Sequence, residues 1–143
     1  MAGNERHNTG RFSVRKAFLI AFSCSCILLV SCSETTPEEL ASIAAKGYYD
    51  HLLQGEYGKF LEGKAGADSL PEQYRGQLIA GYKQFIAQQN TLHRGINEVR
   101  VVNARRDTLL NYTNVFLMFC FNDSTNEQVS VPMVEYQGRW RMK

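Results

Sequence analysis

The chain has 143 residues, with 16 Lys and Arg against 14 Asp and Glu, a formal charge of +2. The positive excess lies in residues 1–31, because residues 32–143 carry 12 Lys and Arg against 13 Asp and Glu, a formal charge of −1. Without a basic surface in that part, the sequence predicts no nucleic-acid binding, and its length fits one domain with a modest core.

The N-terminal residues have the pattern of an export signal. Four basic residues before position 17 are opposed only by Glu5, and then 15 uncharged, mostly apolar residues run from Ala17 to Ser31. A membrane-spanning helix needs roughly 20 apolar residues, so this length favours a cleaved signal peptide over an uncleaved helix. The run ends in Leu29-Val30-Ser31-Cys32, which resembles a bacterial lipobox. We therefore expect cleavage before Cys32.

The resemblance to bacterial lipoproteins implies that Cys32 becomes the lipidated first residue, with a diacylglyceryl group on its thiol and an acyl chain such as palmitate on its amine. Several chains anchor a protein durably, at about 0.8 kcal/mol per buried CH₂. Ser33, in place of Asp, is similar to the sorting signal for the outer membrane, so we expect a cell-envelope location whose face stays open. Cys120 then remains as the single thiol of the mature chain, packed in an apolar strand.

Residues 32–36 are the lipidated cysteine and a short spacer, and residues 37–143 form the predicted domain. The segment Thr36-Pro37-Glu38-Glu39 is a capping box, which predicts a helix over 37–53. A shorter helix is expected over 56–62. A second capping box, Ser69-Leu70-Pro71-Glu72, predicts a helix that ends near Asn90.

The periodicity changes to that of strands after Gly95. Residues 96–105 alternate loosely, and residues 108–122 predict a long strand that is either central and covered on both faces or lines a cavity. Residues 127–136 and 139–142 predict two more strands, and Pro132 indicates an edge position or a bulge in the first of these. Helices followed by a strand meander favour an α+β fold, with the first and third helices covering one face of a curved antiparallel sheet.

Two motifs carry a family resemblance over residues 37–143. The first is Ala-x-x-Tyr-Tyr-x-x-Leu-x-x-Gly-x-Tyr from Ala45 to Tyr57, and the second is Val-x-Val-Pro-Met-Val-x-Tyr-x-Gly-x-Trp from Val129 to Trp140. Together with the leader they look like small Bacteroidetes-type envelope lipoproteins with a cystatin-like, nuclear transport factor 2-like domain of unknown function. The resemblance implies a cone with a pocket between the sheet and the long helix. Such folds serve isomerases, dehydratases, ligand binders and dimerising domains, so the fold alone does not choose a function.

Few residues suggest chemistry. His51 falls on the apolar side of the first helix and is a weak candidate general base, with a hydrogen-bonded structural histidine as the alternative. No His, Cys, Asp and Glu cluster has the spacing of metal ligands, and we expect no metal and no cofactor. Candidates for the lining of a pocket are the aromatic and sulfur-containing side chains that reach the sheet interior, together with the histidine: Tyr48, His51, Tyr82, Phe85, Tyr112, Phe116 and Met118.

Three predicted turns contain a motif that is similar to the O-glycosylation acceptor of exported Bacteroidetes proteins. They are Asp68-Ser69-Leu70, Asp107-Thr108-Leu109 and Asp123-Ser124-Thr125, with Ser69, Thr108 and Ser124 as acceptors. The alternative is that Asp-Ser and Asp-Thr are ordinary turn pairs.

We therefore expect a non-enzymatic envelope lipoprotein that is anchored to the membrane by lipid and binds a small apolar ligand or an envelope protein partner. The alternative is a small hydrolyase or isomerase that uses His51 inside the cone. The resemblance also implies a homodimer formed through the sheet.

Overall fold

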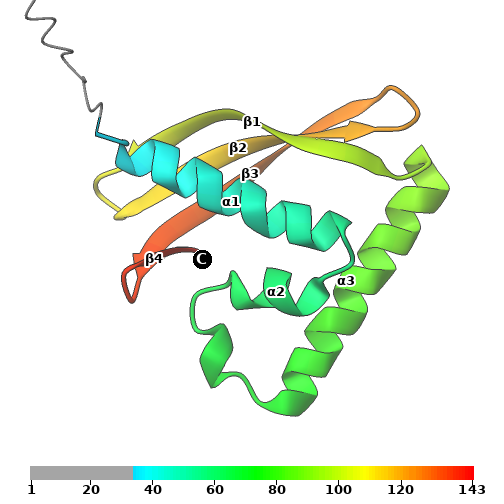
Figure 1. The fold of residues 1–143 in the computed structure, drawn as a ribbon, viewed down its shortest axis with the longest axis horizontal. Coiled ribbons are helices and arrows are strands. Elements are labelled where there is room, and N and C mark those ends of the chain that lie inside the picture. Colours follow the sequence, from blue (N-terminus) through cyan, green and yellow to red (C-terminus); the bar gives the residue numbers. More distant parts are fainter. Residues whose placement is uncertain (1–33) are drawn as a thin grey trace, which may run out of the picture. The chain divides into compact units, whose positions relative to one another are not determined.

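The computed structural model describes residues 34–143, which form one compact unit, so the predicted signal peptide and Cys32 lie outside the described residues. The helices are α1 (Pro37–Leu53), α2 (Tyr57–Glu62) and α3 (Glu72–His93), with a 3₁₀ turn at Ala67–Ser69. The strands β1 (Ile96–Asp107), β2 (Tyr112–Phe121), β3 (Asn126–Tyr136) and β4 (Arg139–Met142) form one antiparallel sheet in the order β1-β2-β3-β4 (Figure 1). The predicted α+β fold is confirmed. Within residues 34–143, no helix is both long and apolar enough to cross a membrane.

Helix α1 has the predicted bounds because its capping box forms. The Thr36 hydroxyl accepts from the Glu39 amide at 3.2 Å, and the Glu39 carboxylate accepts from the Thr36 amide at 3.0 Å. These bonds satisfy donors that the first turn of a helix leaves unpaired. Ala41 and Ala45 are fully buried, and α1 contacts all four strands. Small side chains on this face let the helix axis approach the sheet closely.

The core lies between α1 and one face of the sheet. Alternate residues of the central strand β2 point to that face and are buried: Thr113, Val115, Leu117, Phe119 and Phe121. Val131 and Met133 of β3 continue the same layer. Phe116 and Met118 point to the other face and are half-buried. The central position of β2 is confirmed, but the described helices cover the sheet from one side only (Figure 1).

Helix α3 covers less of the sheet than we expected. None of its 22 residues is buried, and it contacts α2 and β1. Phe60 of α2 lies edge-on to Tyr82 of α3, with 4.8 Å between the ring centroids. Because α2 fills the space between α3 and the core, α3 packs on α2 and extends past the sheet (Figure 1).

The second predicted capping box is wrong. Ser69 ends the 3₁₀ turn, and Pro71 is the N-cap of α3, with no side-chain cap. Leu70 precedes the proline and is extended, with φ −78° and ψ 135°. A residue before proline disfavours the helical region, so the helix begins only after Pro71.

Strand β2 begins at Tyr112, four residues after the start that we predicted for the long strand, because residues 108–111 form a turn. One oxygen of the Asp107 carboxylate accepts from the amides of Leu109 and Leu110, each at 3.0 Å. Asn111 is left-handed, with φ 52°. Asp side chains commonly accept from backbone amides in turns, and Asn tolerates the left-handed conformation there.

Pro132 lies in β3 without a bulge, at the point where pairing with β4 ends and that side of β3 becomes a local edge. Its carbonyl accepts from the amide of Lys143 at 2.8 Å, just past the end of β4. The amide and carbonyl of one strand residue point to the same neighbour. An amide N–H at position 132 would point in the same direction, beyond the last residue of β4 that pairs with β3. Proline lacks this N–H, and no hydrogen bond of the β3–β4 ladder is lost.

Candidate functional site

A concave site with converging polar groups lies where α1 begins, beside the turns that join β1 to β2 and β3 to β4. We call it the hairpin-end pocket. It has a volume of about 390 Å³. Its apolar wall is Pro37, Leu40, Tyr112 and Trp140, and its polar groups are Arg106, Asn111, Thr113 and Glu135.

Strand pairing places the polar side chains of this pocket on the core-facing side of the sheet. Arg106 pairs with Thr113 across β1 and β2, and Thr113 pairs with Met133 of β3. Glu135 lies two residues beyond Met133 and pairs with Trp140. A register shift between Val101 and Asn103 changes which β1 residues face α1 beyond that point. Because of that shift, Arg106, and not its neighbour, faces the pocket.

Three polar groups of the pocket have no partner in the described part of the chain. Neither Arg106 nor Glu135 forms an ion pair there. Thr113 is 0% exposed, and its hydroxyl has no hydrogen-bond partner. Such a buried, unpaired group costs about 1–3 kcal/mol. The pocket therefore offers a cation and an anion to a ligand, while the Thr113 hydroxyl lies buried in its wall.

The aromatic wall of the pocket is held from behind. The Tyr48 hydroxyl donates to the backbone carbonyl of Trp140 at 2.8 Å. Gly63 lies against the Tyr48 ring, and residues 63–65 pair with β4 through bonds between Met142 and both Gly63 and Ala65. Trp140 is thus positioned by residues far from it in the chain.

A second, smaller cavity of about 270 Å³ lies between α1, α2, α3 and the sheet, and we call it the inner pocket. Its lining is apolar except for the tyrosine hydroxyls: Tyr49, Leu52, Phe60, Tyr82, Phe85, Phe119 and Val129. The Tyr82 hydroxyl is buried without a partner. Burial raises the pKa of both Tyr49 and Tyr82, with a smaller contribution from a neighbouring tyrosine in each case. Both phenols stay neutral donors at physiological pH.

The structure distributes the predicted pocket residues over several places. Tyr82 and Phe85 line the inner pocket, and Tyr112 lines the hairpin-end pocket. Tyr48 lies behind Trp140 and lines neither. Phe116 and Met118 lie on the uncovered face of the sheet.

His51 is outside both pockets. Its Nδ1 lies 2.5 Å from a carboxylate oxygen of Glu56, and both side chains are about one-third exposed. Lys59 donates to the other oxygen of Glu56 at 2.6 Å. The hydrogen bonds from Lys59 and then from His51 lower the pKa of Glu56. The group is a surface ion cluster at the junction of α1 and α2.

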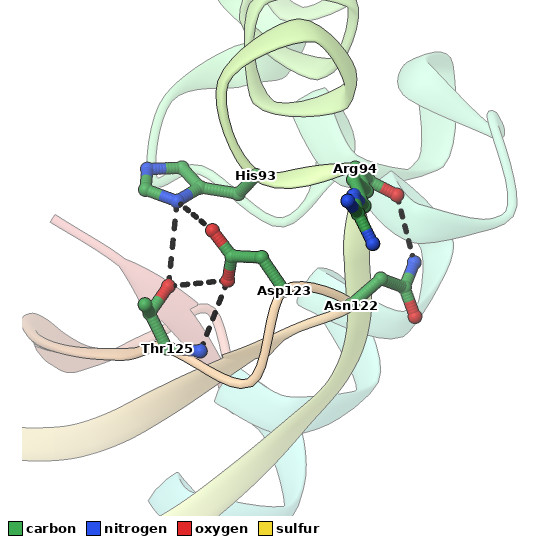
Figure 2. A network of polar contacts seen from close by, with 5 residues as sticks. All are labelled: His93, Arg94, Asn122, Asp123 and Thr125. Carbon is green, nitrogen blue, oxygen red and sulfur yellow. Dashed lines mark hydrogen bonds and ion pairs between the residues drawn. The ribbon is translucent and has the colours of Figure 1, made fainter.

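A second histidine, His93, belongs to a network at the far end of the sheet (Figure 2). Its Nδ1 lies 2.9 Å from Asp123 Oδ2, and the Thr125 hydroxyl donates to Asp123 Oδ1 at 2.5 Å. Hydrogen bonds from Thr125 and His93 lower the pKa of Asp123 to about 2. The His93 ring also stacks on Phe121. These residues line neither pocket, and they fasten the end of α3 to the turn between β2 and β3.

Reasoning from sequence missed Arg106, Thr113 and Glu135. Thr113 left a usable signal, because it is the one polar side chain among the alternate residues 113–121 that face the core.

The predicted glycan acceptors Ser69, Thr108 and Ser124 are exposed, and Cys120 is buried as a free thiol. Among residues 34–143, no group of His, Cys, Asp and Glu side chains could hold a metal ion.

A helical layer on one face of a curved four-stranded sheet is the arrangement of the nuclear transport factor 2-like (NTF2-like) fold. The chain is similar to the crystal structure of a candidate NTF2-like transpeptidase from Campylobacter jejuni, with a TM-score of 0.55 and 11% identity. The match covers 68% of this chain and 92% of that chain. No protein-family model and no curated protein matches the sequence. At this identity the likeness shows the fold alone.

Proposed function

We propose that this protein is a lipid-anchored lipoprotein of the bacterial cell envelope, most simply of the outer membrane, whose NTF2-like domain binds a small ligand without catalysis. Anchoring is supported by the basic, apolar and lipobox segments that precede Cys32 in order. The spacer to α1 is short, so the domain would be held close to the bilayer.

The observation that carries the binding function is the presence of two opposite charges, Arg106 and Glu135, in the lining of the hairpin-end pocket, neither of which forms an ion pair within residues 34–143. Arg106 and Glu135 lie free in the same pocket and can pair with an anion and a cation.

The pocket chemistry favours a ligand that carries both charges and an apolar part. A carboxylate or phosphate would pair with Arg106 and an ammonium group with Glu135, while Trp140 and Leu40 offer apolar contact. This differs from the wholly apolar ligand expected from sequence. The inner pocket has room only for a small apolar group with one acceptor for Tyr82.

Anchoring is tested by the intact mass of protein extracted from membranes with detergent. We expect a chain that begins at Cys32 and carries diacylglyceryl and acyl groups, whereas C32A should carry none. A chain that retains Met1, or begins at an unmodified cysteine, would contradict the anchor. The same mass reports any glycan on Ser69, Thr108 or Ser124.

Ligand binding is tested by thermal shift and calorimetry with zwitterionic amino acids and dipeptides. E135Q and R106Q should each weaken binding by roughly tenfold or more, because each leaves one ligand charge unpaired. E127Q, on the same strand but outside the pocket, is the matched control for E135Q. Equal affinities of E127Q and E135Q for the ligand would contradict the assignment of Glu135 to the binding site.

The hydrolyase or isomerase alternative depended on a carboxylate-bonded histidine inside the cone, and His51, although it contacts Glu56, lies outside both pockets. The homodimer implied by the resemblance would use the uncovered sheet face. We propose M118E as its test, with sedimentation velocity as the measurement: a dimer that M118E leaves intact would not use this face.

A further inference from the structure

The turn between β1 and β2, residues 108–111, carries two adjacent leucines into solvent. Leu109 is 95% exposed and Leu110 is 62% exposed. We propose that this turn inserts into the surface of the bilayer to which the protein is anchored, an inference that rests on the anchoring proposed above. Transfer of two leucines from water to an apolar phase is favourable in proportion to the area removed from water.

Two backbone donors of the turn are already paired within it. Asp107 accepts from the amides of both Leu109 and Leu110, each at 3.0 Å. Unpaired amides are costly in a bilayer, and here the carboxylate pairs them within the turn. The same bonds hold the two leucine side chains at the tip.

The turn lies at the end of the domain that the tether would hold nearest the membrane. Pro37 and Leu40, in the first turns of α1, line the same pocket as Asn111 and Tyr112 of the hairpin. Figure 1 shows the start of α1 and the β1–β2 turn at one end of the sheet, and the β2–β3 turn at the other. An extended chain spans at most about 3.6 Å per residue, so a tether that starts at Cys32 would reach at most about 18 Å to Pro37.

Two cations lie near the turn. Arg105 is exposed on the strand that leads into it, and the Lys143 ammonium lies 5.2 Å from the ring centre of Tyr112, which follows it. Long basic side chains behind an apolar tip can reach lipid phosphates while the tip lies deeper. Anionic lipids attract such clusters.

A protein partner is less well supported. A stable interface buries about 800 Å² on each side, whereas the turn offers two side chains on a convex tip. The tether and the turn converge on the bilayer, so the bilayer is the occupant that we propose.

The test uses the acylated protein in vesicles of phosphatidylethanolamine and phosphatidylglycerol that contain a lipid-borne quencher. An environment-sensitive fluorophore is attached to L109C in one variant and to S124C in the other. S124C is the matched control because it lies in an exposed turn at the far end of the sheet. Cys120 is buried and stays unlabelled in the folded protein.

We expect the L109C probe to shift to the blue and lose most of its emission to the lipid-borne quencher, while the S124C probe changes little. If the vesicles retain the protein but both probes stay in water, insertion is overturned and anchoring stands. A blue shift that depends on protein concentration and not on lipid would assign the turn to a second copy and overturn the proposal. A glycan on Thr108 would also overturn it. If the native protein proves to carry no acyl chains and does not float with the vesicles, anchoring and insertion are overturned together.

Discussion

Replacing Gly63 with alanine should destabilise the domain through one specific collision. A Cβ at this position would lie 2.5 Å from two ring atoms of Tyr48 and 2.9 Å from a third. Gly63 has φ −68°, a conformation that alanine adopts freely, so the cost is steric. The ring cannot withdraw without breaking its hydrogen bond to Trp140, 2.8 Å long.

The magnitude follows from the two losses. Overpacking costs about 1–3 kcal/mol and the lost hydrogen bond about 1 kcal/mol, so G63A should lose about 2–4 kcal/mol. For a domain of this size each kcal/mol lowers Tm by roughly 4–8 °C, which predicts a fall of at least about 8 °C. Thermal and urea unfolding followed by circular dichroism measure it.

Two variants decide whether the collision is the cause. Gly58 has open space around its Cβ position and lies within α2, so G58A should be neutral or stabilising by up to about 1 kcal/mol. In a Y48A background the ring is absent, so adding G63A should cost nothing. A stable G63A, or an equal cost of G63A in both backgrounds, would refute the reasoning.

Three further predictions concern stability. T113V should raise the free energy of unfolding by roughly 1 kcal/mol, because it removes an unpaired buried hydroxyl, whereas T113S should not; a loss in T113V would mean that the hydroxyl has a partner. The pKa of Asp123 is about 2 in the folded protein against 3.8 for the free group, so its contribution is present above pH 4 and is lost as the pH falls towards 2. Acid unfolding of D123N should therefore depend less steeply on pH over that range, and a curve parallel to that of the wild type would contradict the assignment. T36A should cost about 1 kcal/mol by removing the cap of α1, while S69A, whose box does not form, should cost little; equal losses in urea melts would contradict this difference.

Local signals in the sequence were sufficient for most of the elements. The capping box at Thr36 predicted the start of α1 because all its bonds join residues three apart. The box at Ser69 failed because Pro71 acts on the residue before it. The turn after Asp107 was missed because the predicted strand includes residues 108–111 as its start. One carboxylate, that of Asp107, closes this turn.

The tertiary structure alone decided which polar side chains share the hairpin-end pocket. Arg106, Thr113 and Glu135 come from three strands, and a one-residue shift after Val101 turns Arg106 towards α1. Strand register depends on pairing between distant segments, and a slip of one residue exchanges the two faces. No local pattern records that shift.

The sequence by itself determined the order of helices and strands, and it is the sole source of the predicted lipid anchor. Both are read along the chain, from caps, periodicity and a short processing motif. Only the tertiary structure decided the uncovered sheet face, the position of His51 outside the cone and the unpaired Thr113 hydroxyl. These depend on which distant residues meet, and that is settled by packing, not by local preference.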